Sequence, residues 1–365
     1  MMPLRRALVD SAAISANVEL LRGLAPAAHT MVVIKADGYG HGAARAGFAA
    51  LAGGADWLGV ADLSEAYEVR DAGIDAPLLA WLHAPDEDFR EAVARDITIG
   101  VSRIEQLEAL AAIGGARVHL KVDTGLGRNG VGSADRDALF ARAAQLHHSR
   151  TITLEGIMSH VAGTSRDSDL AQGEDFMTAL GQLADHGVTP ELQHMTASAA
   201  SLSYPSLRGS MVRFGIAAYG IAPSPDYAGL AIKPAMRLET EIALTKRLRA
   251  GEGVSYDHTW RADADTTVVL VPLGYADGVP RHSSGHGWVE ISGVRYPVAG
   301  RVAMDQIVVS VGDDPIRVGD RVALWGDPAE GTPSAAEWAS WSDTIGYDIV
   351  TGVGRRVARA EWSRS

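Results

Sequence analysis

The sequence predicts an α/β protein: a (β/α)8 barrel of the TIM type followed by a C-terminal, mostly-β domain. Up to about residue 222, short apolar runs rich in β-branched residues alternate with longer Ala-, Leu-, Glu- and Arg-rich stretches. After Pro223 and Pro225, short alternating segments separated by turns replace that pattern. The chain has 365 residues. Since one domain takes roughly 150 residues, we expect two domains.

Eight apolar runs are the expected barrel strands, and an eightfold alternation favours a closed barrel over an open doubly wound sheet, which is the alternative. Helical patterns lie between most of them, for example at 64–72, 103–113 and 135–147. The seventh strand has the weakest pattern, and the helix after it is expected to be short. The runs are Met31–Ala36, Trp57–Ala61, Pro77–Leu82, Ile97–Val101, Val118–Asp123, Thr153–His160, Glu191–Met195 and Val212–Tyr219.

An additional strand and helix precede the barrel. Residues 7–9 are expected to form the strand, and Asp10 or Ser11 to cap a helix over 14–24 that closes or links the barrel. We expect residues 1–230 to form the barrel domain and 231–365 the β domain. Strands of the second domain are expected at 238–244, 266–273, 288–291, 306–311 and 321–325, with one helix at 335–341.

Composition excludes several classes of protein. Hydrophobic residues make up 47% and charged residues 21%, which is ordinary for a globular protein and unlike disordered or fibrous chains. The net charge of −12 argues against nucleic-acid binding. The arginines at 355, 356, 359 and 364 are expected to belong to a solvated tail.

Cysteine is absent, which excludes disulfides, thiolate metal sites and a cysteine nucleophile, and fits a cytoplasmic protein. No run of about 18 apolar residues predicts a membrane span, and no signal-peptide core follows the first arginines. No metal site is expected either, because His282 and His286 lie in a Ser/Gly loop without an acidic motif.

The first motif is Lys-Ala-Asp-Gly-Tyr-Gly-His-Gly at residues 35–42. Lys35 follows an apolar strand, at the end of the barrel where active sites lie. Apolar surroundings disfavour the ammonium form, so the pKa of this lysine falls and its amine becomes a usable nucleophile. The glycines are expected to let the backbone approach a ligand. A lone lysine here would be an ordinary surface residue, but the octet resembles the pyridoxal-phosphate signature of alanine racemases.

The second motif, Lys-Val-Asp-Thr-Gly-Leu-Gly-Arg at residues 121–128, is similar to a second signature of that family. Its glycines match a dinucleotide fingerprint only weakly, since this is the fifth barrel strand and no helix opens there. Strand alternation puts His119, Lys121 and Asp123 on one face, and a lysine inside the barrel needs a partner or a modification. The resemblance implies that Lys121 is carbamylated and holds Arg128, which binds the substrate carboxylate.

Further polar residues follow the later strands. The barrel rule brings His160, Ser198 and Arg213 to the same face, where phosphate is often bound. Singly, each is unremarkable, and a lone strand-end histidine is usually structural. The family resemblance implies that Arg213 faces the cofactor's pyridine nitrogen and that His160 packs in the Arg213 network. It also implies a set of residues that hold the cofactor phosphate: Tyr39, Ser198, Gly215, Ile216 and Tyr347.

Three segments of the second domain, at residues 253–260, 273–281 and 300–306, resemble the family's remaining signatures. The resemblance implies that Tyr256 is a catalytic base and that Met304 contacts substrate, each in the partner subunit's site, within a homodimer. Without the resemblance, Tyr256 would be interpreted as a half-buried strand aromatic. The supporting residues of these segments are Tyr275, Asp277, Arg281, Arg301 and Asp305.

The resemblance covers essentially the whole chain and implies a racemase that uses pyridoxal 5'-phosphate to interconvert L- and D-alanine, supplying D-alanine for peptidoglycan. Lys35 and Tyr256 of the partner subunit would act on opposite faces of the substrate. Serine or another small amino acid is an alternative substrate. A barrel decarboxylase is a rival, but it would pair the ring nitrogen with an acid and use a cysteine; a non-catalytic carrier of the cofactor would lack the β domain. The chain departs from the usual family pattern at Ala197, Phe214, Val279, Ala303 and 346–348.

Overall fold

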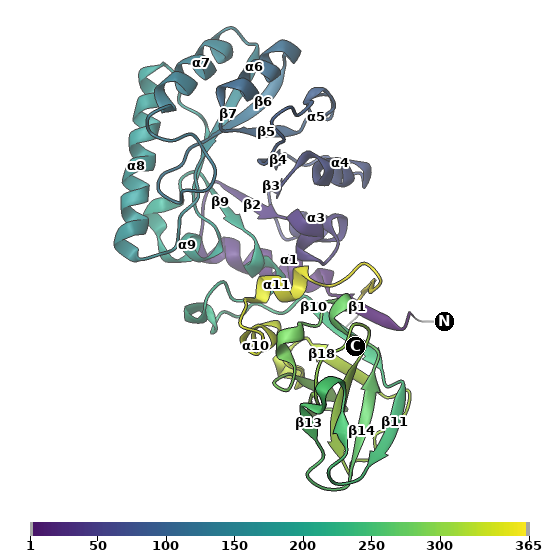
Figure 1. Ribbon diagram of the computed structural model, residues 1–365. Helices are drawn as coiled ribbons and strands as arrows, with labels where there is room; N and C mark the ends of the chain where they lie inside the picture. Colours follow the sequence, from purple (N-terminus) through teal and green to yellow (C-terminus); the bar gives the residue numbers. More distant parts are fainter. Residues whose placement is uncertain (1–2, 363–365) are drawn as a thin grey trace.

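The structure, a computed structural model, describes residues 3–362 and consists of an α/β barrel joined to a smaller β domain (Figure 1). Eight strands form the barrel sheet in the order β8-β7-β6-β5-β4-β3-β2-β9, and each neighbouring pair is parallel. The Ser210 N–H donates to the Gln193 carbonyl at 3.0 Å and brings the segments of β8 and β9 together, so the barrel is nearly closed. The strands are β2 (His29–Val33), β3 (Trp57–Val60), β4 (Leu78–Ala80), β5 (Thr98–Val101), β6 (Ala116–Lys121), β7 (Ile152–Met158), β8 (Leu192–His194) and β9 (Met211–Phe214).

Helices cover the outside of this sheet, and the barrel prediction is confirmed (Figure 1). The expected short seventh unit is confirmed as well, because β8 has three residues and the helix that follows it six. The helices are α1 (Ser11–Leu24), α3 (Ala43–Ala52), α4 (Leu63–Asp71), α5 (Arg90–Ala94), α6 (Ile104–Ile113), α7 (Arg136–His148), α8 (Arg166–Asp185) and α9 (Ser198–Ser203), with a single turn, α2 (Lys35–Tyr39), after β2.

The N-terminal segment links the two domains. The carboxylate of Asp10 caps α1 by accepting from the Ala13 N–H at 2.8 Å, and Ile14, Val18 and Leu21 bury one face of the helix at helical spacing. Strand β1 (Arg5–Val9) instead joins the sheet of the β domain, antiparallel to β10 (Met236–Glu241) and parallel to β19 (Ala358–Glu361). The expected linking role is therefore confirmed.

The β domain contains a six-stranded sheet, β16-β15-β18-β10-β1-β19, a three-stranded sheet, β11-β14-β17, and the hairpin β12-β13. Its two helices, α10 (Ala335–Ser340) and α11 (Gly346–Thr351), lie toward the barrel (Figure 1). The remaining strands are β11 (Leu244–Leu248), β12 (Gly253–Val254), β13 (Trp260–Arg261), β14 (Thr266–Val271), β15 (Trp288–Ile291), β16 (Val294–Pro297), β17 (Ile307–Gly312) and β18 (Arg321–Trp325).

The expectation of a solvated C-terminal tail was wrong. Arg356 pairs with Asp277 at 2.6 Å, and the Nε of Arg359, a residue of β19, donates to the Gly40 carbonyl at 3.1 Å. Strand β19 has the sequence Ala-Arg-Ala-Glu, so its apolar face consists of two alanines only, and its pairing with β1 rather than its composition makes it a strand. Arg364 lies outside the described residues.

A cluster of large apolar side chains fills the barrel interior. Met158 and Trp81 belong to this cluster and also line the main cavity of the barrel, so the cluster forms part of the cavity floor.

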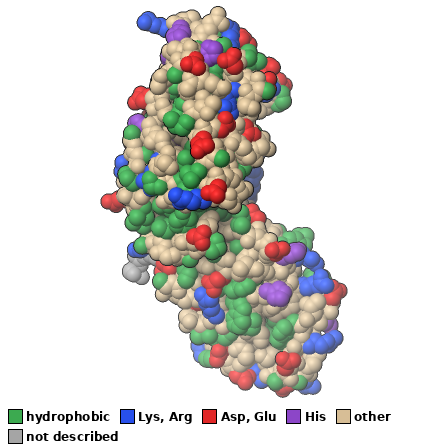
Figure 2. Space-filling model, turned by 90° about the vertical axis from the view of Figure 1, so that its left-hand side faces the viewer, with side chains coloured by type: hydrophobic (Ala, Val, Ile, Leu, Met, Phe, Trp, Pro, Cys, Tyr) green, Lys and Arg blue, Asp and Glu red, His purple; other side chains and the backbone are tan. Residues whose placement is uncertain are grey.

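None of the described helices is long and apolar enough to cross a membrane. On the face shown in Figure 2, lysines and arginines are interspersed with acidic side chains and form no continuous basic patch.

Candidate active site

A cavity of about 610 Å³ opens at the C-terminal ends of the barrel strands. Its lining residues follow different strands, with Lys35 after β2, Lys121 at the end of β6 and His160 after β7. It therefore occupies the position where barrel enzymes bind substrates. The cavity brings together all the site residues predicted on the barrel, and Tyr347 of α11: Lys35, Tyr39, Lys121, Arg128, His160, Ser198, Arg213, Gly215, Ile216 and Tyr347.

Lys35 begins an unusual turn. The backbone of Ala36, Asp37 and Gly38 is left-handed, with φ of 53°, 52° and 61°. This conformation costs roughly 1–2 kcal/mol for each residue with a side chain. Glu65 holds the turn by accepting from the Ala36 N–H at 2.6 Å, and the Asp37 carboxylate accepts from the Ala43 N–H at 2.8 Å. The strain is thus maintained beside a candidate catalytic residue, which is typical of functional sites.

Burial, and secondarily the positive charge of Arg128, lowers the pKa of Lys35. No carboxylate among the described residues lies within ion-pair distance of its ammonium group to oppose that shift, although Glu65 acts weakly from farther away. A lowered pKa raises the fraction of neutral amine, as the sequence analysis expected.

The glycines after Lys35 were expected to let the backbone approach a ligand closely, but two of them are packed against protein. A Cβ at Gly38 would lie 2.9 Å from the Cβ of Ala46, and one at Gly40 would lie 2.2 Å from the Val350 carbonyl oxygen of α11. These glycines therefore allow the left-handed turn to pack against protein. Gly215 is different: its Cβ would lie 2.5 Å from the Tyr39 hydroxyl, inside the cavity.

Neutral hydrogen-bond donors gather on one side of the cavity. The Ser198 Oγ accepts from the Gly215 N–H at 3.1 Å, and the ring centroids of Tyr39 and Tyr347 lie 6.2 Å apart. Burial raises the pKa of both tyrosines, so their hydroxyls stay protonated and can donate. Hydroxyls and backbone N–H groups together suit a phosphate oxyanion.

Arg213 forms the centre of a buried hydrogen-bond network. Its guanidinium donates to the Ser159 carbonyl at 2.9 Å, to the His160 Nδ1 at 3.2 Å and to the His194 Nδ1 at 2.7 Å. A guanidinium can only donate, so both histidines accept and are neutral. His194 then donates from Nε2 to the His119 Nδ1, 3.0 Å away.

Burial dominates the electrostatics of this network. It lowers the pKa of Arg213 to about 10, which leaves the guanidinium charged near neutral pH. Burial, and then the charge of Arg213, lowers the pKa of His119 and of His160 to about 3. No acidic side chain among the described residues pairs with Arg213.

Lys121 is 6% exposed at the end of β6, and His119 lies on the same face of that strand, as alternation predicted. Burial, followed by the charges of Arg213 and Arg128, lowers the pKa of Lys121 to about 8. Asp123 does not serve as the partner of Lys121, because its carboxylate accepts from the Gly125 N–H at 2.9 Å and shapes the following loop. That loop opens no helix, so the dinucleotide fingerprint is excluded.

Apart from Tyr347, the predicted residues of the β domain do not line the cavity. Tyr256 is 67% exposed and Met304 52% exposed, on two loops that lie close together. The Ser255 hydroxyl donates to the Arg301 carbonyl at 2.8 Å, and the Ala276 N–H donates to the Met304 carbonyl at 2.9 Å. The three β-domain motifs thus form one surface.

Ion pairs fix these loops. Asp277 is fully buried and pairs with Arg356 at 2.6 Å, and Arg356 also pairs with Asp305 at 2.7 Å. Arg301 pairs with Asp257 at 3.0 Å. Tyr275 is 42% exposed, and Arg281 is exposed at the start of a short 3-10 turn.

Sequence reasoning missed Trp81 and assigned no role to His194. Trp81 follows β4 and fits between two neighbouring strands, since a Cβ at Gly59 or Gly100 would lie 2.8 Å or 3.0 Å from it. Two glycines at the same level of strands flanking an aromatic are the signal that could have indicated a bulky cavity wall. Among the described residues, no group of three or more His, Asp or Glu could hold a metal.

Family models assign this architecture. The N-terminal domain of alanine racemase matches residues 9–223, and its C-terminal domain matches residues 235–361. The chain belongs to the alanine racemase family, and it is an isomerase of amino acids.

Individual relatives agree over nearly the full length. The alanine racemase of Thermobifida fusca is 45% identical over 97% of this chain and 96% of its own, and that of Mycolicibacterium smegmatis 44% over 96% and 93%. Among solved structures, alanine racemase from Streptomyces lavendulae superposes with a TM-score of 0.96 at 40% identity, covering 100% of this chain and 98% of that one. The Bacillus anthracis enzyme, solved with bound L-Ala-P, has a TM-score of 0.91 at 31% identity and covers 100% and 96%.

Proposed function

We propose that this chain interconverts L- and D-alanine with pyridoxal 5'-phosphate as cofactor, that it works as a homodimer, and that Lys35 and Tyr256 of the partner subunit are the two bases. The protein would act in the cytoplasm, and its D-alanine would be used to make peptidoglycan. The strongest support is that Lys35 and Arg213 line the same cavity, and that no carboxylate of the described residues belongs to the hydrogen-bond network of Arg213. The proposed domains are residues 1–230 and 231–365, with β1 of the first segment joining the sheet of the second.

The residues of the cavity fit the cofactor. A lysine of lowered pKa suits the aldehyde, the hydroxyls of Tyr39, Ser198 and Tyr347 suit the phosphate, and Arg213 suits the pyridine nitrogen. The absence of a side chain at Gly215 leaves room for the Tyr39 hydroxyl, which would lie 2.5 Å from a Cβ at that position. When bound, the cofactor supplies an electron sink that acidifies the Cα–H bond of an attached amino acid.

The proposed mechanism then depends on the chain's own proton carriers. The Lys35 amine takes or returns the Cα proton on one face, and the hydroxyl of Tyr256 of the partner subunit does so on the other. Each positioned group of this kind typically contributes about 10²- to 10⁴-fold. Because its pKa of about 10 keeps Arg213 charged, this residue binds the ring nitrogen without readily protonating it. Reprotonation at Cα is then favoured over transamination.

Lys121 and Arg128 are proposed to orient the substrate carboxylate. An amine reacts with CO₂ only when neutral, and a pKa of about 8 provides that form at Lys121. The neutral amine nitrogen bonds to CO₂ and releases one proton. Counted from the ammonium form, two protons leave, and a buried cation becomes an anion that can hold Arg128. Arg213 and Arg128, whose charges lower the pKa of Lys121, would then lie near an anion instead of a cation.

Two measurements test these proposals. The purified protein with added cofactor should convert L-alanine to D-alanine, with serine and other small amino acids assayed in parallel; fast conversion of serine but not alanine would overturn the substrate assignment. The carbamate is tested by carbon-13 NMR with labelled bicarbonate. A carbamate signal is expected from the wild type and absent from Lys121→Met, and its absence from both would contradict the modification.

A further inference from the structure

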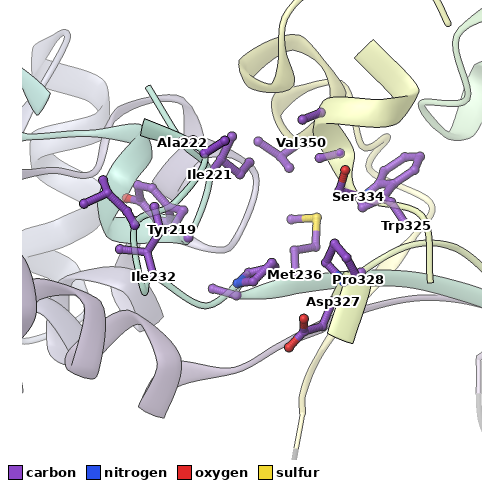
Figure 3. Close-up of a pocket in the computed structure, with 18 of the residues that line it drawn as sticks. Tyr219, Ile221, Ala222, Ile232, Met236, Trp325, Asp327, Pro328, Ser334 and Val350 are labelled. Atoms are coloured by element: carbon purple, nitrogen blue, oxygen red, sulfur yellow. The ribbon is translucent and has the colours of Figure 1, made fainter. Parts of the chain in front are cut away.

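A second cavity, of about 310 Å³, lies between the barrel and the β domain. Tyr219, Ile221 and Ile232 form one side, Trp325, Pro328 and Val350 the other, and Met236 lies between them (Figure 3). The floor is buried, while rim residues such as Ala228 and Ala336 are exposed, so a small molecule could enter from solvent. The proposed reaction assigns no role to this cavity.

The lining is mostly apolar, but two residues in it have buried polar atoms without a hydrogen-bond partner. They are the Nε2 of His41 and the Nε1 of Trp325, and neither has a partner within residues 3–362. Buried polar atoms are nearly always paired, with protein or with a bound molecule. Two such atoms around one cavity indicate that something polar is bound there.

The tautomer of His41 is fixed by its surroundings. Its Nδ1 lies 3.0 Å from the Gly38 carbonyl oxygen and 2.9 Å from the Tyr39 carbonyl oxygen. Both partners can only accept, so Nδ1 carries the hydrogen. Burial lowers the pKa of His41 to about 4, so the ring is neutral and Nε2 has a lone pair. His41 therefore offers an acceptor, whereas the indole of Trp325 offers a donor.

We propose that this cavity binds a small hydroxylated aromatic molecule, with its ring in the apolar space and its hydroxyl group donating to the His41 Nε2. Oxygen lone pairs of the same class of ligand can accept from Trp325. Size permits it, because an apolar cavity of about 150 Å³ already holds benzene. The inference rests on this cavity alone and stands independently of the proposed reaction.

The position of the cavity connects it with the candidate active site. The ring of His41 lies 4.6 Å from that of Tyr219, which lies 4.9 Å from that of Tyr39. Tyr227 lines both cavities. A bound molecule would thus contact side chains that also pack around the proposed phosphate site.

The probe is 4-methylphenol, titrated calorimetrically into the full-length protein, with toluene as the matched compound that lacks the hydroxyl. We expect one saturable site per chain and an affinity for 4-methylphenol about three- to tenfold higher than for toluene, the contribution of one hydrogen bond. Equal affinities would show that the hydroxyl makes no contact and would overturn the proposal. No binding of either compound would also overturn it, leaving water as the occupant.

Three variants locate the site. Ile232→Trp fills the cavity and should abolish binding of both compounds; retained binding would place the site elsewhere. His41→Phe removes the acceptor and should equalise the two affinities, and a preference that persists would contradict the assignment. Should His41→Phe fail to fold, because it also loses the bonds from Nδ1, Ile232→Trp still decides the location. Trp325→Phe removes the indole N–H together with the five-membered ring, so both affinities change but the preference for 4-methylphenol over toluene should narrow; an unchanged ratio would contradict the proposed donor.

Discussion

The barrel cavity and the β-domain loops present their candidate catalytic groups in opposite ways. In the barrel, Lys35, Lys121 and Arg213 lie in a cavity where burial lowers the pKa of each. In the β domain, Tyr256 and Met304 are more than half exposed on loops held by ion pairs. Desolvation is the largest cause of these three pKa shifts, and the barrel supplies it within one chain. Exposed side chains on a rigid surface instead suit the proposed homodimer, in which the partner's cavity would supply that desolvation.

The backbone around Tyr256 supports this contrast. Ser255, Asp257 and His258 have φ of 60°, 59° and 43°, so Tyr256 is presented by a strained segment. Such strain persists only where the surrounding structure enforces it and clusters at functional sites. A tyrosine that served only to pack would be buried and would need no such presentation.

Removal of Lys35, the proposed nucleophile of the barrel, should have the largest effect. Lys35→Ala lacks the only lysine of lowered pKa at the end of β2, so racemisation should fall below detection and the visible absorbance of covalently bound cofactor should disappear. Spectroscopy after borohydride treatment checks this. A reducible adduct that remains in the variant would show that another amine holds the cofactor, and would contradict the role proposed for Lys35 in the barrel.

The β-domain half is tested by Tyr256→Phe, which keeps the ring and deletes the hydroxyl. Because one of two positioned proton carriers is lost, turnover should fall by about 10²- to 10⁴-fold, with cofactor absorbance unchanged. Steady-state assays in both directions measure it. Arg261→Gln, an exposed neighbour in β13, is the control and should retain activity. Near-normal turnover of Tyr256→Phe would reduce the tyrosine to a packing residue.

A smaller effect is expected on the pH dependence of the free energy of unfolding, to which a buried histidine of the barrel contributes and an exposed histidine of the β domain does not. His119 is buried with a pKa of about 3 when folded, below its ordinary 6.5, so between these values the unfolded chain binds more protons. Stability is then fully present above the unfolded pKa and is lost as pH falls toward the folded one, by about 2 kcal/mol at about pH 5. Urea unfolding across pH measures this slope.

His119→Leu should flatten that slope while lowering stability at all pH values, because the His194 Nε2 loses its partner. The exposed His286, changed to Gln in the β domain, should leave the slope as it is. Identical slopes in the wild type and His119→Leu would contradict the burial of a neutral histidine pair.

Much of the fold could be predicted from sequence because repeated burial patterns determine it. The eight apolar runs all became barrel strands, since parallel strands are buried on both faces. Strand β19 escaped prediction because backbone pairing alone defines it. The left-handed turn at 36–38 escaped as well, because the carboxylates of Glu65 and Asp37 stabilise it from outside the local pattern.

The candidate site was predictable only in part. Lys35 and Arg213 stand in motifs, and strand ends place them at one face. The hydrogen bonds from Arg213 through His194 to His119 join three strands, and the position of Trp81 depends on glycines of the two flanking strands. Such contacts depend on barrel closure, so no single segment predicts them.

Complementation between two inactive variants tests the shared site most directly. Homodimers of Lys35→Ala and of Tyr256→Ala are dissociated together and allowed to reassort. In a mixed dimer one site receives both defects, and the other combines an intact Lys35 from one chain with an intact Tyr256 from the other. Random reassortment makes about half of the dimers mixed, so activity should recover to roughly a quarter of wild type. If mass spectrometry proves subunit exchange and no activity returns, each chain uses its own tyrosine or none, and the two-subunit account is contradicted.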